Sequence, residues 1–134
     1  MEMPEETATV EQAAAAIGST QRQIVKSLLL VADSGPILVL AAGDRRVDVA
    51  HVARQLGLDS VRMARAEEVK RITGFSIGGV APFGHDTVLP TYLDERLLAE
   101  DIVYAAAGTR FRVFAVGPAA LLELAAARVI QVSG

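Results

Sequence analysis

The sequence predicts an α+β domain in which a mixed sheet or small barrel carries helices on its outside. About seven short β-rich runs are interspersed with four helical segments, and they lack the regular strand–helix–strand order of a parallel α/β sheet. The chain has 134 residues, close to the commonest size of one domain. Because 51% of the residues are hydrophobic, it can build a core without disulfides, and we expect a single domain over residues 1–134.

A helix and a β-hairpin open the predicted fold. The sequence TVEQ at 9–12 fits a capping box, which predicts a helix over residues 9–17 that stops at Gly18. Two β-rich runs follow at 24–32 and 36–42. The Asp-Ser-Gly sequence between them predicts a hairpin turn of three or four residues.

Two short helices and a strand form the predicted middle of the chain. Asp48 is a favourable N-cap for a helix over 48–56, whose apolar residues share one face. A short strand at 61–64 and a helix at 66–72 come next. Each helix ends at a glycine, Gly57 and Gly74.

The chain changes character after the third helix. Residues 74–90 are rich in glycine and proline, which is typical of a shaped loop. Beyond it we expect strands at 91–93, 102–106, 112–116 and 129–132, and a helix that Pro118 opens and that runs to about residue 126.

Charge and composition exclude several classes of function. A formal charge of −3 argues against a broad electrostatic grip on DNA or RNA, although four glutamates without a base among the first eleven residues account for the acidity. The charge distribution still allows one weakly basic face that contacts one end of a nucleic acid. The absence of cysteine excludes thiolate catalysis and disulfides. The first residues do not resemble a signal peptide and no apolar run is long enough to span a membrane, so we expect a cytoplasmic protein.

Lys26 is the first candidate site residue. Strand alternation places it on the same face as Leu28 and Leu30, which we expect to be buried. It either extends to solvent or pairs with a carboxylate, or it is a cation at the mouth of a pocket that binds a phosphate or carboxylate of a ligand.

The second candidate is the glycine-rich run Gly78-Gly79-Val80-Ala81-Pro82-Phe83-Gly84. It matches neither a Walker loop nor a dinucleotide fingerprint. Its glycines would let the backbone approach a ligand closely, and Pro82 would fix the exit of the loop. A plain connector is the alternative.

Other titratable and nucleophilic residues give weaker signals. His85 beside Asp86 is a general base with its carboxylate or, more simply, a turn-capping pair. His51 has no second ligand at helical spacing, so we assign no metal, and we expect no cofactor. The serines lack a Gly-x-Ser-x-Gly setting.

Taken in order, several segments resemble the YbaK / prolyl-tRNA-synthetase-associated editing-domain family. They are TATVEQAAAAIG, QIVKSLLLV, AAGDRRVDVAHVARQLG, EEVKRITGFSIGGVAPFG, LPTYLDERLL and AAAGTRF, which together extend over nearly the whole chain. The resemblance implies a mixed six- to seven-stranded barrel-like sheet with outer helices. It also implies an aminoacyl-tRNA deacylase that hydrolyses the ester of a mischarged tRNA, most often proline tRNA carrying a small wrong residue such as alanine or cysteine.

The resemblance also implies roles for particular residues. Lys26 matches the family's essential lysine, which holds the phosphate or ribose region of the terminal adenosine. Gly78 to Pro82 match the Gly-x-x-x-Pro loop, in which Gly78 and Gly79 help to place water on the ester carbonyl and Val80, Ala81 and Pro82 shape the amino-acid pocket. Gly108 matches the glycine on the other side of the site. We add Ser27, His85 and Arg110 as substrate-binding candidates.

The chain departs from the family pattern in two places. Relatives usually have a helix and a strand before the segment that begins here at Thr7, so this domain is expected to lack them. A sheet edge left unpaired in this way would favour a homodimer. Phe111-Arg112-Val113 stands where some relatives carry a polar or acidic residue, which leaves the substrate open.

Three functions therefore remain. The first is a trans-editing deacylase whose partners are the 3′ end of aminoacyl-tRNA and prolyl-tRNA synthetase. The second is a non-catalytic module of the same fold that binds tRNA ends or a synthetase. The third is a nucleotide-binding regulatory domain, which would not respond to the aminoacyl group.

Overall fold

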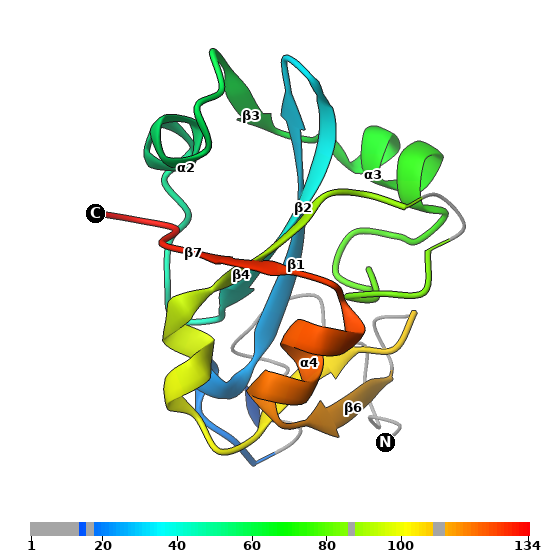
Figure 1. Cartoon of the computed structure of the whole chain (residues 1–134). Helices are drawn as coiled ribbons and strands as arrows, with labels where there is room; N and C mark the ends of the chain where they lie inside the picture. Colours follow the sequence, from blue (N-terminus) through cyan, green and yellow to red (C-terminus); the bar gives the residue numbers. More distant parts are fainter. Residues whose placement is uncertain (1–13, 16–17, 86–87, 109–111) are drawn as a thin grey trace.

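A five-stranded mixed sheet in the order β3-β1-β2-β4-β7 forms the centre of the molecule (Figure 1). The computed structural model describes residues 14–15, 18–85, 88–108 and 112–134. The strands of this sheet are β1 Val25–Ala32, β2 Gly35–Ala42, β3 Val61–Met63, β4 Thr91–Asp94 and β7 Arg128–Ile130. β1 pairs antiparallel with β2 and β3, whereas β4 runs parallel to β2 and β7.

A second sheet holds β5 (Val103–Ala106) and β6 (Val113–Val116), paired antiparallel. One parallel bridge, between Ile24 and Tyr104, connects it to the start of β1. The α+β class and the seven predicted strands are thus confirmed, but in the described residues the strands belong to two sheets. Closure of the two sheets into a barrel stays a prediction.

The β1–β2 hairpin is tighter than predicted. Ala32 lies opposite Gly35 in the ladder, so the turn has two residues, Asp33 and Ser34, rather than three or four. Gly35 has φ 126°, a conformation that side chains disfavour, and it can therefore serve as the first residue of β2. The predicted strand start at Pro36 was one residue late for this reason.

Three predicted α-helices are present among the described residues, together with two 3₁₀ helices. They are η1 Gln21–Gln23, α2 Val49–Leu56, α3 Ala66–Thr73, η2 Glu95–Ala99 and α4 Pro118–Leu124. The Asp48 carboxylate accepts hydrogen bonds from two amides of the first turn of α2, as predicted. The two 3₁₀ helices were not predicted. Of the helix predicted over 9–17, residues 14–15 are helical and the rest lies outside the described residues.

The hairpin is buried on both faces and divides the interior into two cores. The loop-side core contains Val25, Leu29, Leu38, Leu40, Val69, Val80, Leu93 and Leu97. The α2-side core contains Leu30, Ile37, Val39, Ala41, Val52, Ile130 and Val132. Figure 1 shows α3 and the following loop on one side of the hairpin and α2 on the other. No helix within the described part of the chain is long and apolar enough to cross a membrane.

An ion pair fastens α3, and hence the start of the loop, to β3. The two carboxylate oxygens of Glu68 lie 2.8 and 2.9 Å from the guanidinium nitrogens of Arg62. Glu68 also accepts the backbone N–H of Arg65 at 2.9 Å. The bidentate bond from Arg62, followed by the Arg65 amide, lowers the pKa of Glu68 to about 2.

This geometry predicts an acid dependence of stability. The folded pKa of Glu68 lies below its ordinary value of 4.5, so its contribution is present above pH 4.5 and is lost as the pH falls toward 2. Glu68→Gln should lower the free energy of unfolding at pH 7 and reduce its decline between pH 4.5 and 2. Urea unfolding across this range measures both effects. Glu67→Gln, at an exposed neighbour, is the control, and an equal effect of the two substitutions would contradict the assignment.

Candidate functional site

Two of the predicted site residues, Lys26 and Ser27, lie where β1 and β5 separate. The two strands run parallel and meet at the Ile24–Tyr104 bridge. Farther along β1, on the edge opposite β2, β3 pairs with Leu30–Ala32. Among the described residues, no strand pairs with residues 25–28 of β1 on this edge, and we call residues 25–28 the unpaired stretch. Lys26 and Ser27 both lie in it.

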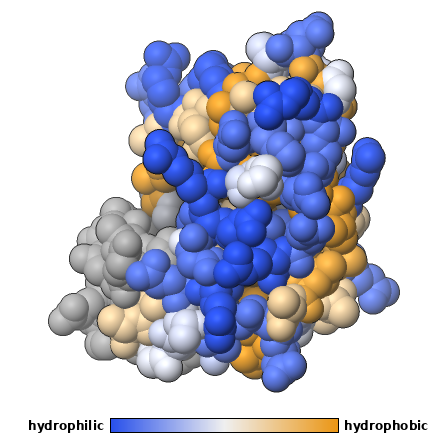
Figure 2. Space-filling model, turned by 90° about the vertical axis from the view of Figure 1, so that its left-hand side faces the viewer, coloured by the Kyte–Doolittle hydropathy of each residue, from blue (hydrophilic) through white to orange (hydrophobic). Residues whose placement is uncertain are grey.

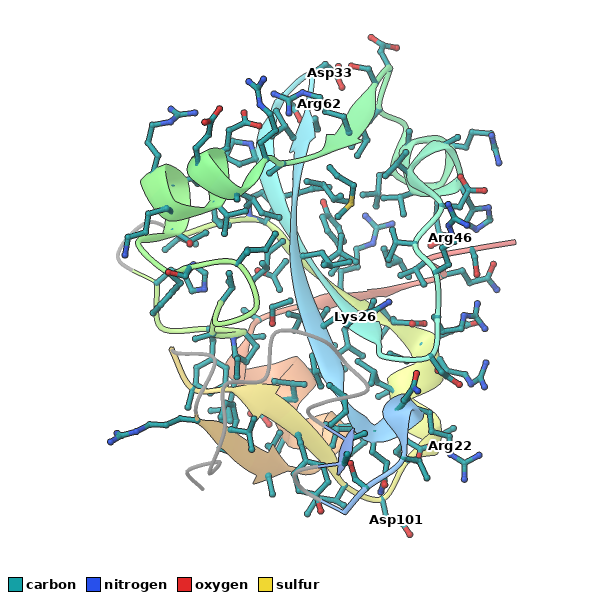
Figure 3. All side chains as sticks on the ribbon, turned by 180° about the vertical axis from the view of Figure 1, so that it is seen from behind. Arg22, Lys26, Asp33, Arg46, Arg62 and Asp101 are labelled. Carbon is teal, nitrogen blue, oxygen red and sulfur yellow. The ribbon has the colours of Figure 1, made fainter. Side chains whose placement is uncertain are left out.

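Lys26 belongs to the α2 side of the sheet. Its side chain is half-buried, and its ammonium donates a hydrogen bond to the backbone carbonyl of Arg45. Figure 3 shows it on the side of β1 that faces the segment carrying Arg46. The structure thus anchors the cation on a backbone carbonyl near the end of β1.

Ser27 points the opposite way, into the loop-side core. It alternates with Val25 and Leu29, which both belong to that core. Its hydroxyl is buried and has no hydrogen-bond partner among the described residues. Buried hydroxyls without a hydrogen-bond partner are rare in folded proteins. The Ser27 hydroxyl is therefore an isolated polar group among apolar side chains.

The turn that leads from α3 into the loop is built by Thr73. Its hydroxyl donates to the carbonyl of Val69 at 2.6 Å and accepts the N–H of Phe75 at 3.0 Å. Gly74 adopts φ 79°, and its N–H bonds the Lys70 carbonyl at 2.9 Å. This arrangement directs the Phe75 ring toward the site.

The Gly78–Pro82 segment is an ordered loop, packed on the core. Gly78 is exposed and has φ 84°, and the N–H of Gly79 closes a turn on the Ser76 carbonyl at 2.9 Å. Val80 is 2% exposed and Pro82 is fully buried. The half-buried Ala81 lies between these two anchors, so the backbone of the loop is held in a defined path.

His85 and Phe75 join the loop to the turn after β5. His85 Nε2 lies 2.5 Å from the carbonyl oxygen of Ala81, so this nitrogen is the donor. Its ring meets the Phe75 ring edge to face, with centroids 5.2 Å apart. The Phe75 ring lies 3.4 Å from the place that a Cβ on Gly108 would occupy, and Gly108 has φ 98°. The loop and the Gly108 turn therefore share one wall.

The remaining candidates from the sequence are two residues outside the described ranges and the histidine of α2. Arg110 and Asp86 lie outside the described residues, so the His85–Asp86 pair stays a prediction. His51 lies on α2 beside Gly134. The part of the chain that the structure describes holds no group of three or more His, Asp or Glu able to ligate a metal.

Thr73 and Phe75 were missed as site residues by the sequence reasoning. Both belong to the Thr-Gly-Phe segment, which entered the resemblance as a motif without any role. The position of Thr73 in the sequence could have indicated this role. A threonine in the last helical turn before a glycine can hydrogen-bond both the helix backbone and the residue that follows the glycine.

The other side of the molecule carries a different cavity. An open space of about 370 Å³ lies between α2 and β3, lined by Val49, Ala50, Ala53, Arg54, Leu58, Asp59, Ser60 and Val61. None of the predicted site residues lines it. The face that carries α2 and the C-terminal end is largely hydrophilic (Figure 2).

The chain is similar to several known proteins. A family model for the aminoacyl-tRNA editing domain matches residues 4–124. The uncharacterized protein YwhH of Bacillus subtilis (strain 168) is 38% identical over 126 residues, which cover 92% of this chain and 78% of that protein. EbsC of Enterococcus faecalis, a candidate Cys-tRNA(Pro)/Cys-tRNA(Cys) deacylase, is 28% identical over 121 residues, 90% of this chain and 74% of EbsC. The crystal structure of a candidate trans-editing enzyme for prolyl-tRNA synthetase shares a TM-score of 0.93 and 44% identity, covering 100% of this chain and 85% of that chain.

The hydrogen bonds of the Thr73 hydroxyl predict that its removal destabilises the folded protein. Thr73→Val keeps the side-chain shape but leaves the Phe75 amide without its acceptor, and we expect a loss of about 1 to 2 kcal/mol in the free energy of unfolding. Thr73→Ser retains the hydroxyl and should cost less than half of this. Urea unfolding of the three proteins measures the difference, and equal stability of the valine variant and the parent would contradict the role given to the hydroxyl.

Proposed function

Because the chain belongs to the aminoacyl-tRNA editing-domain family, we propose that it is a trans-editing deacylase that hydrolyses the ester of a mischarged tRNA. The proposed substrate is proline tRNA that carries a small wrong amino acid, alanine or cysteine. One observation carries the proposal: the Gly78–Pro82 loop and the Gly108 turn share the Phe75 wall. Lys26 and Ser27 occupy the unpaired stretch of β1.

The proposed reaction needs no nucleophilic side chain. An ester is already activated compared with an amide, so a positioned water, backbone dipoles and one cation can supply the catalysis. Gly78 and Gly79 present backbone without side chains and hold water against the ester carbonyl. Lys26 holds the phosphate or ribose of the terminal adenosine from the α2 side of β1.

The amino-acid pocket is proposed to have a wall of backbone and small side chains. Val80 and Pro82 are buried, so Ala81 and the two glycines are what the substrate side chain would meet, with Gly108 on the other side of the Phe75 ring. Such a wall favours small residues by size. The naming of the relative EbsC for cysteinyl esters agrees with a small substrate.

The rival proposal is a module of this fold that binds a tRNA end or a synthetase without hydrolysis. It is favoured by the anchoring of the Lys26 ammonium on the Arg45 carbonyl, on the face away from the loop. Incubating the protein with alanyl-, cysteinyl-, seryl- and prolyl-tRNA(Pro) and following amino-acid release separates the two. The deacylase releases the small wrong residues, whereas the module binds all four and releases none.

The proposal also covers the location, domain organisation and assembly of the protein. We place the protein in the cytoplasm as one domain over residues 1–134, acting beside prolyl-tRNA synthetase. In the described part of the sheet, β3 and β7 are the outer strands. Pairing of such an edge with a second copy would give the proposed homodimer.

The role of Lys26 predicts a loss of activity without a loss of fold. Lys26→Ala and Lys26→Met should abolish deacylation of alanyl-tRNA(Pro), because both remove the cation that is proposed to hold the terminal adenosine. The variants should stay folded with a lower melting temperature, since a hydrogen bond from a charged ammonium to a carbonyl contributes about 1.5 to 3 kcal/mol. Arg128→Ala, at an exposed position on β7, is the control and should retain activity. Activity of the Lys26 variants within about threefold of the parent would contradict the role.

The backbone wall predicts selectivity by size. The parent should accept several small amino acids, because one methylene in such a pocket is worth about 1 to 3 kcal/mol. Gly79→Ala adds a methyl at a buried position and should lower all rates, most strongly for the bulkier substrates. Gly117→Ala is the control, since a Cβ there meets no atom within 4 Å.

Hydrolysis rates for the four esters on one tRNA measure the effect. Equal losses for all four in Gly79→Ala, or absolute preference of the parent for one polar side chain, would contradict the backbone wall.

A further inference from the structure

Nδ1 of the His85 imidazole is buried, and no described residue donates a hydrogen bond to it. A carbonyl oxygen can only accept, so the bond to Ala81 requires the proton on Nε2. In the neutral ring Nδ1 is then a lone-pair acceptor. This nitrogen is buried and has no hydrogen-bond partner among the described residues.

The ring cannot easily turn to satisfy this nitrogen. Its Nε2 is committed to the Ala81 carbonyl, and its face is fixed by the edge-to-face contact with Phe75, 5.2 Å between centroids. Phe75 is itself oriented by Thr73. A buried, oriented acceptor without a donor is uncommon in folded proteins, and a ligand that brings a donor is a physical reason for keeping it.

The place of His85 limits which donor of the substrate can reach it. Its imidazole contacts Ala81 and Phe75, which in the proposed function form the wall around the amino acid rather than the site of the tRNA phosphates. The donor that every aminoacyl ester carries next to its reacting carbonyl is the α-ammonium group. A charged donor also makes the stronger hydrogen bond with a neutral acceptor.

We propose that His85 Nδ1 accepts a hydrogen bond from the α-ammonium group of the aminoacyl ester, so that the enzyme selects esters with a free amino group. This inference rests on the proposed deacylase function. It makes His85 a specificity residue that excludes N-blocked esters, such as peptidyl- and formyl-aminoacyl-tRNA. The Ser27 hydroxyl, which is also buried and has no hydrogen-bond partner among the described residues, has no such requirement for charge.

The test compares alanyl-tRNA(Pro) with N-acetyl-alanyl-tRNA(Pro) and lactyl-tRNA(Pro). In the lactyl ester a hydroxyl replaces the ammonium without added bulk. The parent should prefer the alanyl over the acetylated ester by about 10- to 100-fold in kcat/KM, with the lactyl ester between them.

Two His85 variants separate recognition from structure. His85→Gln retains an N–H donor for the Ala81 carbonyl, and His85→Phe removes both nitrogens but keeps the ring beside Phe75. Both should bring the alanyl-to-acetyl ratio close to one by slowing the alanyl ester. A purely structural role would slow all three esters equally and leave the ratio unchanged, which would overturn the proposal.

His51→Gln is the matched control. This second histidine also has a buried ring nitrogen, Nε2, without a partner among the described residues, but it lies on α2. It should leave every ratio unchanged. An alanyl ester on a tRNA ending in 2′-deoxyadenosine tests the competing donor, the ribose 2′-hydroxyl. If the His85 variants alter discrimination against this substrate and not against the acetylated one, the ammonium assignment is wrong.

The proposed function and this inference can fail separately. If the parent hydrolyses none of the esters, the deacylase proposal fails, and binding then decides the role of His85. The probes are 3′-alanylamino-3′-deoxyadenosine and its N-acetyl derivative, measured by calorimetry. A preference for the free amine that disappears in both His85 variants supports the inference, and no preference in the parent overturns it.

Discussion

The alternation of side chains along β1 is the constraint on which the rest of the structure depends. β1 and β2 form a hairpin buried on both faces, so each residue of β1 belongs to one of two cores. Lys26 and Ser27 are neighbours in the chain and therefore face opposite sides. A substrate that meets both must lie across the edge of β1, and residues 25–28 are where the described strands leave that edge unpaired. The position of the site thus follows from the position of a gap in the ladder.

The loop beside this gap owes its shape to contacts at its ends and flanks. Val80 and Pro82 are buried, and His85 holds the Ala81 carbonyl between them. A backbone fixed in this way can direct its dipoles without reorganisation, which is what an electrostatic catalyst requires. The proposed function is compatible with the overall charge of −3, because the proposed substrate offers one nucleic-acid end rather than a long run of phosphates.

Local signals made much of the fold predictable. Asp48, Gly57 and Gly74 mark helix ends through hydrogen bonds made within a few residues, and the hairpin follows from its two apolar runs. Contacts between distant residues were not predictable. Asp94 is fully buried because its carboxylate accepts the N–H of Ala42, 52 residues away, and Lys26 is anchored by a carbonyl 19 residues away. The sequence therefore suggested candidate site residues and the face of β1 that carries Lys26, whereas the carbonyl that anchors its ammonium depends on a tertiary contact.

The central claim is that the substrate's aminoacyl end lies on the loop side of β1, against the Phe75 wall. Amide chemical shifts of the ¹⁵N-labelled protein, titrated with 3′-alanylamino-3′-deoxyadenosine, test this most directly. The account predicts changes concentrated in residues 75–85, in the turn around Gly108 and in the unpaired stretch of β1. Changes confined to the cavity between α2 and β3, with the Gly78–Pro82 loop unaffected at saturation, would contradict it.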